Sequence, residues 1–226
     1  FMAADIPDNS LTAAQQDEEG ALRRDMAAVF RVAARLGWNE QIGNHNSIML
    51  PRRHAEEAPT FLINPRGMLF QEITASSLIV CDLDGNVLRG AGELRKVAFH
   101  IHARIHMANP AAVCIVHVHP QYLTALSMLE EPLRVTHMDA TMFFEDCAFL
   151  EDWPGNPVSE VEGRIISEAL GGKRAILLAN HGLAVAGASI EEAAYLAVCF
   201  ERAARMQIRA RAVGRLKAID PALARD

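Results

Sequence analysis

The centre of the chain reads Val113-Cys114-Ile115-Val116-His117-Val118-His119-Pro120. Its first four residues are apolar and predict a buried β-strand. Side chains two positions apart on a strand point to the same face, so His117 and His119 should converge on one spot at the end of this strand. Two converging imidazoles are half of a metal site. The alternative is a pair of hydrogen-bonded histidines at a strand end.

A third histidine follows the second strongly apolar run of the sequence. Residues Ala175-Ile176-Leu177-Leu178 predict a strand, and Ala179-Asn180-His181-Gly182 come directly after it. With His181 added to the pair, metal binding is favoured over a simple hydrogen-bonded pair. Neutral imidazoles suit Zn²⁺, Mn²⁺ or Fe²⁺. Three protein ligands would leave coordination positions open for a substrate.

Composition indicates one globular domain. The chain has 226 residues, half of them hydrophobic, which is enough to bury one sizeable core. We predict a flexible, polar and acidic lead-in over residues 1–20 and a single domain over 21–226. The net charge of −6 argues weakly against nucleic acid as a partner.

The cysteines and the apolar runs bear on the cellular compartment. The four cysteines are scattered and lack CxxC spacing, which is typical of reduced core residues: Cys81, Cys114, Cys147 and Cys199. No apolar run is long enough to cross a bilayer, and no secretory signal pattern is visible. We therefore expect a cytoplasmic protein without a membrane partner.

Strands and helices interleave outward from the central strand. Helical periodicity predicts helices over 19–36, 94–107, 122–129, 161–170 and 190–213. Short apolar runs predict strands over 48–50, 61–63, 78–81, 87–89, 113–116, 175–178 and 183–186. The polar cluster 43–47 predicts a turn. Hairpin signals are frequent and no strict βαβ repeat appears, so the fold class is an α/β sandwich with a largely antiparallel sheet.

Several segments together resemble the class II aldolase/adducin family, over roughly Ala21 to Arg211. They are Asn44-His45-Asn46-Ser47, Phe61-Leu62-Ile63-Asn64-Pro65-Arg66-Gly67, Ile73-Thr74-Ala75-Ser76-Ser77-Leu78, the run His102 to Pro120, and Ala179-Asn180-His181-Gly182-Leu183. The resemblance implies an α/β/α sandwich around a nine-stranded, mainly antiparallel sheet. It also implies a homo-oligomer, usually a tetramer, with active sites at subunit interfaces. By similarity, the ligands of a divalent metal are His117, His119 and His181.

The chain departs from the sugar-phosphate aldolases of this family. Those enzymes carry a glutamate, a ligand and acid/base, four residues before the position of His102, where this chain has Ala98. Glu93 lies five residues further upstream and could substitute only if the local backbone differs. The aldolase tyrosine near this region is replaced by Met138, and the serine pair that helps hold phosphate is absent. These losses make a sugar-phosphate aldolase the less favoured reading.

The resemblance also places candidate substrate-binding residues in two turns. They are Asn44, His45 and Ser47 in the first turn, and Arg66 and Gly67 in the second. His45 would bind a phosphate, a carboxylate or another part of the substrate, or would simply cap a turn. Arg66 offers a bidentate fork for a carboxylate, unless it is only a solvated turn residue.

Two further histidines are candidates for proton chemistry. His137 is a possible general acid or a donor near the metal. His102, on the helix before the central strand, would lie near the site, either as a catalytic group or in a structural role.

These residues predict a metal-dependent carbon–carbon lyase that acts on a small anionic molecule. A bound metal stabilises charge on an oxygen next to the breaking bond. A decarboxylase of a hydroxy-aromatic, heteroaromatic or keto acid is favoured, because it needs neither the aldolase glutamate nor the tyrosine. The alternatives are a fuculose- or ribulose-type sugar-phosphate aldolase, a non-heme iron oxygenase, and a non-catalytic module like the adducin head.

Overall fold

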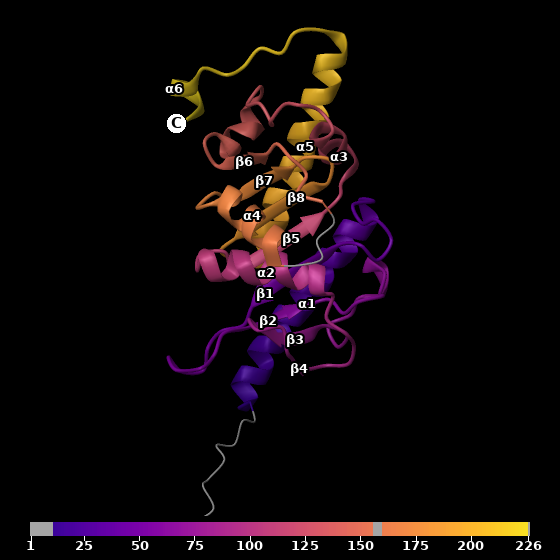
Figure 1. Cartoon of the computed structure of the whole chain (residues 1–226), viewed down its shortest axis with the longest axis vertical. Helices are drawn as coiled ribbons and strands as arrows, with labels where there is room; N and C mark the ends of the chain where they lie inside the picture. The colour runs from indigo at the N-terminus through magenta and orange to yellow at the C-terminus, as the bar shows by residue number, and fades with distance from the viewer. Residues whose placement is uncertain (1–10, 156–159, 226) are drawn as a thin grey trace, which may run out of the picture.

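The central strand, β5 (Cys114–Val118), lies inside an eight-stranded sheet with the order β4-β3-β2-β1-β5-β8-β7-β6. The computed structural model describes residues 11–155 and 160–225, and the sheet is drawn in Figure 1. The other strands are β1 (His45–Met49), β2 (Thr60–Ile63), β3 (Ile79–Asp82), β4 (Val87–Arg89), β6 (Cys147–Leu150), β7 (Ala175–Leu178) and β8 (Gly182–Gly187). Neighbouring strands are antiparallel except β6 and β7. The sheet of the described residues has eight strands rather than the nine expected.

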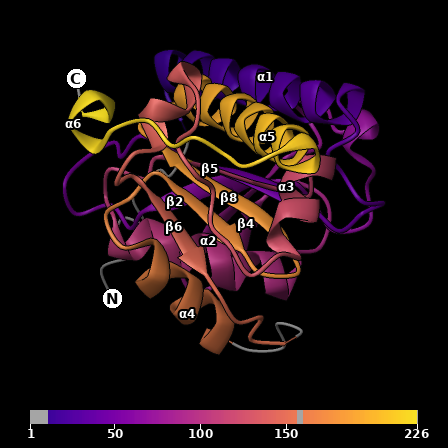
Figure 2. The ribbon, with the colours of Figure 1, turned by 90° about the horizontal axis from the view of Figure 1, so that it is seen from above.

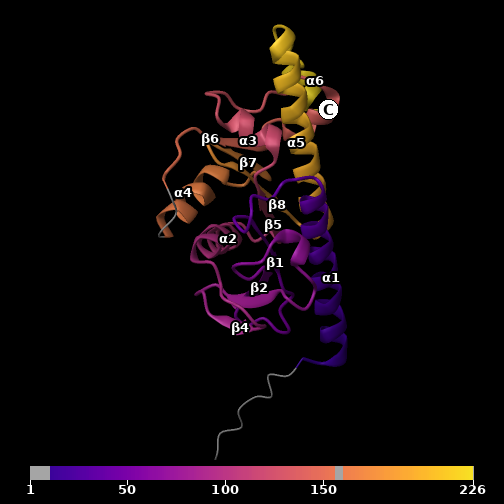
Figure 3. The same cartoon turned by 90° about the vertical axis from the view of Figure 1, so that its right-hand side faces the viewer.

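Helices cover both faces of the sheet, as expected for an α/β/α sandwich. They are α1 (Ala13–Arg35), α2 (Lys96–Ala108), α3 (Gln121–Ser127), α4 (Glu160–Leu170), α5 (Ile190–Val213) and α6 (Pro221–Ala224), with 3₁₀ turns η1 (Phe70–Glu72) and η2 (Met138–Phe143). Helices α1 and α5 lie on one face, and α2 and α4 lie on the other (Figures 2 and 3). No helix of the described residues is both long and apolar enough to cross a membrane.

Side chains along β5 point alternately to the two faces of the sheet, and this determines the face on which His117 lies. Cys114, Val116 and Val118 belong to the core that includes residues of α1 and α5, whereas Ile115 packs with residues of α2 and α4. His117 is two residues after Ile115, so its side chain faces the α2 side of the sheet. This alternation places the central histidine beneath α2.

Helix α1 begins earlier than its apolar periodicity predicts. Thr12 accepts a hydrogen bond from the backbone of Gln15, and the Gln15 side chain accepts one from the backbone of Thr12. This capping box satisfies amide groups at the start of the helix, which therefore includes residues 13–20. The predicted flexible lead-in is wrong for these residues, and its residues 1–10 lie outside the described part of the chain.

Strand β1 also begins earlier than predicted. A turn was expected over residues 43–47, but β1 begins at His45. In the pairing of β1 with β5, His45 lies opposite His117 and Ser47 lies opposite Ile115. Polar residues occur in this buried strand because their side chains hydrogen-bond inside the protein. Strand β6 was not predicted from the mixed segment before Leu150. It forms the parallel edge with β7.

Candidate metal centre and active site

Three histidines meet at one end of the central strands. His117 is on β5, His119 follows that strand directly, and His181 lies in the turn between β7 and β8. One nitrogen of each ring lies within 4.8 Å of the corresponding nitrogens of the other two. The ring centroids are 4.8 Å apart for His117–His181 and His119–His181, and 5.2 Å apart for His117–His119. We call these three residues the histidine cluster.

The turn before β8 is shaped to bring His181 to the cluster. Asn180 adopts the left-handed conformation with φ of 54°, which asparagine tolerates better than most residues. At Gly182 a Cβ atom would lie 2.8 Å from His119 Cδ2 and 2.8 Å from the Val118 carbonyl oxygen. A glycine is therefore required for this turn to approach His119 so closely.

His117 and His119 each form a hydrogen bond through Nδ1, so their Nε2 atoms remain available to a ligand. His117 Nδ1 donates to the Leu183 carbonyl at 2.7 Å. His119 Nδ1 lies 3.0 Å from Glu40 Oε2, and His119 Nε2 is buried without a hydrogen-bond partner among the described residues. An unpartnered buried nitrogen is costly unless a ligand engages it.

Burial favours the neutral form of two cluster histidines, His117 and His181. The pKa of His117 is well below its usual value, because of burial and then because of neighbouring histidines. Burial followed by the proximity of His119 lowers the pKa of His181 to about 4. Neutral imidazole is the form that binds metal ions. The donor set therefore fits a divalent metal.

Glu40 is a site residue that the sequence reasoning missed. Its carboxylate supports His119, an arrangement that orients metal-binding histidines in proteins. Its backbone N–H donates to Asn44 Oδ1 at 2.6 Å, and the nearby Trp38 carbonyl accepts from the His119 N–H at 2.9 Å. Glu40 lies in an ordinary polar stretch, and no local pattern links it to a residue 79 positions later.

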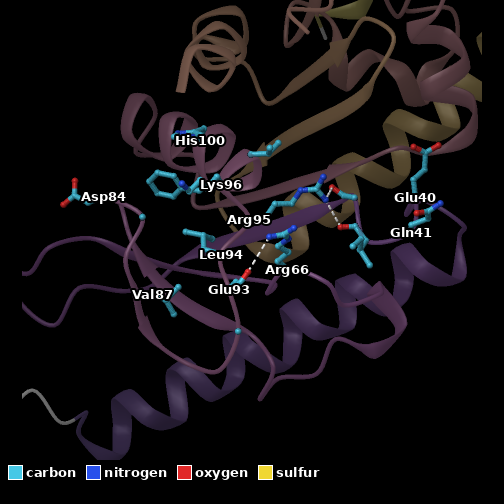
Figure 4. Close-up of a pocket in the computed structure, with 16 residues that line it drawn as sticks. Glu40, Gln41, Arg66, Asp84, Val87, Glu93, Leu94, Arg95, Lys96 and His100 are labelled. Carbon is cyan, nitrogen blue, oxygen red and sulfur yellow. Dashed lines mark hydrogen bonds and ion pairs between the residues drawn. The ribbon is translucent and has the colours of Figure 1, made fainter. Parts of the chain in front are cut away.

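A cleft of about 1050 Å³ has Glu40 in its wall (Figure 4). Glu40, through its contact with His119, connects this cleft to the cluster, whose three histidines do not line it. The side chains of Arg66, Arg95 and Lys96 also line it. The Arg95 guanidinium donates to the carbonyls of residues 42 and 43 at 2.8 and 3.1 Å, which fixes its position. The carboxylates of Glu40, Asp84 and Glu93 line the cleft as well, so its lining carries charges of both signs.

Glu93 does not join the cluster within the described residues. Its carboxylate lies 3.5 Å from Arg66 Nη1, and both side chains are largely exposed. The Glu93 carbonyl also accepts the Arg66 N–H at 2.8 Å, and Gly67 forms the turn with a φ of 89°. The structure thus places Glu93 beside an arginine instead of beside the histidines. Ala98, at the position of the aldolase glutamate, is a buried core residue.

The residues predicted in the first turn are buried. Asn44 is 1% exposed, and its Nδ2 has no hydrogen-bond partner among the described residues, so it could donate to a ligand. Ser47 differs, because it is fully buried and its hydroxyl contacts two histidines. This contradicts the expectation that Ser47 contacts the substrate directly.

Ser47 belongs to a chain of buried polar groups between β1 and α2. His45 Nδ1 lies 2.8 Å from His102 Nε2, and His102 Nδ1 contacts the Ser47 hydroxyl. The same hydroxyl lies 2.8 Å from His106 Nε2, and His106 Nδ1 lies 2.6 Å from the Ala112 carbonyl oxygen. We call this the His–Ser chain. It places His102 one ring away from the cluster, because His45 stacks on His117.

His137 is not brought to the cluster by any contact among the described residues. It caps η2, where its Nδ1 accepts the Ala140 N–H at 3.1 Å. Its Nε2 is buried and unpartnered within the described chain. Met138, at the position of the aldolase tyrosine, is 77% exposed.

Comparison with known proteins identifies the family and agrees with the fold. The model of the class II aldolase and adducin N-terminal domain matches residues 24–208. The chain is 34% identical to the decarboxylase NovR of Streptomyces niveus, over 88% of this chain and 73% of that protein. It is also 34% identical to a 4-hydroxy-3-prenylphenylpyruvate oxygenase/4-hydroxy-3-prenylbenzoate synthase of Streptomyces roseochromogenus subsp. oscitans, over 88% of this chain and 71% of that protein.

A solved structure extends the comparison to the whole fold. The L-fuculose 1-phosphate aldolase of Glaciozyma antarctica PI12 superposes with a TM-score of 0.83 at 31% identity. The superposition covers 95% of this chain and 83% of the aldolase chain. The range matched by the family model, residues 24–208, contains the positions of the histidine cluster. The chain therefore belongs to the class II aldolase and adducin N-terminal domain family.

Proposed function

We propose that the protein is a metal-dependent carbon–carbon lyase that decarboxylates a small hydroxy-aromatic, heteroaromatic or keto acid. The observation that carries this proposal is the histidine cluster, in which three imidazoles converge and His119 Nε2 is left unpartnered among the described residues. His117, His119 and His181 would hold Zn²⁺, Mn²⁺ or Fe²⁺. When bound, the metal supplies Lewis-acid stabilisation of negative charge on an oxygen next to the breaking bond.

The cleft that contains Glu40, the partner of His119, would hold the carboxylate of the acid. Arg95, held by two backbone carbonyls, and Lys96 would attract a carboxylate, and Arg66 would do so in competition with its partner Glu93. The departing group leaves as CO₂, its bonding electrons move toward the neighbouring oxygen, and a proton replaces it on carbon. Proton delivery by His137 would require an oligomer that brings this residue to the cluster of another chain. The expected homo-tetramer, with sites at subunit interfaces, is part of the proposal.

Three placements favour decarboxylation over aldol cleavage. Ala98 leaves no carboxylate at the aldolase position, Glu93 pairs with Arg66, and Met138 replaces a proton-donating tyrosine. The 34% identity to the decarboxylase NovR is consistent with this choice. The similarity to an L-fuculose 1-phosphate aldolase keeps the sugar-phosphate aldolase as the competing function.

One panel of assays tests the proposal. Zinc-, manganese- and iron-loaded protein is incubated with ortho-hydroxy aromatic acids, keto acids and fuculose- or ribulose-type phosphates, and CO₂, aldehyde and oxygen uptake are measured. We expect metal-dependent CO₂ release from an acid. Cleavage of a sugar phosphate without CO₂ release would assign an aldolase, and iron-dependent oxygen uptake would assign an oxygenase. A metal content near zero after purification without chelator would favour the non-catalytic module.

A further inference from the structure

The contact between His106 and Ala112 determines in which direction the hydrogen bonds of the His–Ser chain are donated. The Ala112 carbonyl oxygen can only accept, so His106 Nδ1 must carry the hydrogen of their contact. Burial lowers the pKa of His106 to about 4, and the side chain is 5% exposed. A neutral His106 has a bare Nε2, which can only accept a hydrogen bond from the Ser47 hydroxyl.

Once the hydrogen of one contact is assigned, the donor and the acceptor of the next contact along the chain follow from it. Ser47 has one hydroxyl hydrogen, and His106 takes it, so the Ser47 oxygen must accept from His102 Nδ1–H. His102 is fully buried and neutral, so its Nε2 accepts from His45 Nδ1–H. His45 is 3% exposed, and a second hydrogen on its Nε2 would create a buried imidazolium, so the ring carries its one hydrogen on Nδ1 and Nε2 is bare. Reversing the order would place hydrogens on both nitrogens of His106, and a buried imidazolium is strongly disfavoured.

The bare nitrogen belongs to a ring that lies against the cluster. His45 and His117 are cross-strand partners, and their rings stack with centroids 4.7 Å apart and planes inclined by 26°. His45 Nε2 makes no hydrogen bond within the described part of the chain. His45 is thus a preformed hydrogen-bond acceptor beside the proposed metal site.

We propose that His45 is a specificity-determining residue that accepts a hydrogen bond from a hydroxyl group of the ligand at the histidine cluster. This inference rests on the proposed function, and it reverses the expectation that His45 binds an anion. A ring nitrogen without a hydrogen cannot donate to a carboxylate or phosphate oxygen. The lone pair of this nitrogen and a lone pair of such an oxygen repel one another. A hydroxy acid bound at the cluster supplies the hydroxyl donor that such an acceptor requires.

Neutron diffraction tests the hydrogen positions directly. Crystals of the full chain, exchanged into heavy water, should show deuterium on His45 Nδ1 and none on His45 Nε2. The same map should show deuterium on Nδ1 of His102 and of His106. Deuterium on His45 Nε2 would overturn the inference, whatever the activity of the protein.

Variants at the far end of the chain test whether His106 sets the tautomer of His45. His106→Leu frees the Ser47 hydroxyl to donate to His102, so we expect deuterium on His45 Nε2 in part or all of the molecules. His106→Gln can still accept from Ser47 and donate to Ala112, so it should preserve the wild-type arrangement. A His45 tautomer unchanged in His106→Leu would contradict the directional argument. The wild-type map decides the inference even if neither variant folds.

Ligand binding tests the specificity. Calorimetry on the zinc-loaded protein compares 2-hydroxybenzoate with 2-methoxybenzoate, which has no donor. We expect His45→Phe to reduce the preference for 2-hydroxybenzoate by roughly tenfold, the loss of about one hydrogen bond. His54→Phe, at an exposed histidine outside the site, should leave the preference unchanged. An undiminished preference in His45→Phe would reject the role of His45.

The two proposals fail separately. If the protein binds zinc and releases CO₂ but carries deuterium on His45 Nε2, only the inference about His45 is wrong. If the histidine cluster binds no metal, the proposed lyase fails, whereas the hydrogen positions of the His–Ser chain are still measured.

Discussion

The histidine cluster and the His–Ser chain both consist largely of histidines in one region of the protein. They differ in how many of their ring nitrogens form hydrogen bonds within the protein. In the His–Ser chain the contacts run in sequence from His45 to the Ala112 carbonyl oxygen. In the cluster, His117 and His119 form hydrogen bonds through Nδ1 only, and His119 Nε2 is buried and unpartnered in the described structure. A buried histidine is thus a ligand candidate when a ring nitrogen is left unused, as in the cluster and at His45, whereas His102 and His106 use both ring nitrogens within the protein.

The largest effect should come from removing a cluster histidine. We expect His181→Ala to lower metal affinity more than about 100-fold, since even residues that only support a ligand cost 10–100-fold. Lyase activity should be lost with the metal. Metal content by mass spectrometry and CO₂ release check this result, with exposed His54→Ala as the matched control. Unchanged metal content in His181→Ala would mean that the cluster is not the metal site.

Cutting the His–Ser chain should affect stability more than metal binding. Ser47→Ala leaves His102 Nδ1–H without its acceptor and His106 Nε2 without its donor, both in a buried region. We expect the free energy of unfolding to fall by about 2–4 kcal/mol while metal content is retained. Urea unfolding and metal analysis measure the two quantities. If metal is lost and stability is unchanged, the proposed division of roles is wrong.

Glu162 on α4 provides an unpartnered buried group outside any ligand cluster. It is 4% exposed, neither carboxylate oxygen has a partner among the described residues, and burial raises its pKa from 4.5 to about 7. The protonated form therefore favours folding. Stability should be highest below about pH 4.5 with respect to this group, and should fall by up to about 3 kcal/mol as pH rises through 7.

Denaturant unfolding across this pH range tests the contribution of Glu162. Glu162→Gln should remove most of the fall, and Glu168→Gln, at an exposed position on the same helix, should not. A wild-type stability that rises between pH 4.5 and 7, with the rise abolished in Glu162→Gln, would show that the carboxylate has a partner outside the described residues.

The smallest effect concerns Glu40, which supports the cluster from an exposed position. Glu40→Gln weakens the acceptor for His119 Nδ1–H, so we expect metal affinity to fall about tenfold, the low end of the range for such residues. Competition with a zinc chelator measures the affinity. Glu93→Gln is the control and should not change it, because Glu93 pairs with Arg66. A loss larger in Glu93→Gln than in Glu40→Gln would restore the aldolase-like site.

Local sequence patterns were sufficient to predict the part of the fold that carries the cluster. Four apolar residues and a spacing of two predicted that His117 and His119 share a face, and the apolar run 175–178 placed His181 after a strand. The helix 190–213 was predicted with the bounds of α5, because a segment of this length is too long to be a strand. In contrast, polar residues concealed the start of β1, since only hydrogen bonds to distant residues make their burial favourable.

By itself the sequence determined that strand-end histidines of this chain would share a face, because the periodicity of a strand is a local property of the backbone. Only the tertiary structure decided which ring nitrogens are used. Glu40 reaches His119 from 79 residues away, and His102 reaches His45 from 57 residues away. The position of a hydrogen on an imidazole depends on such partners, and no local pattern specifies them.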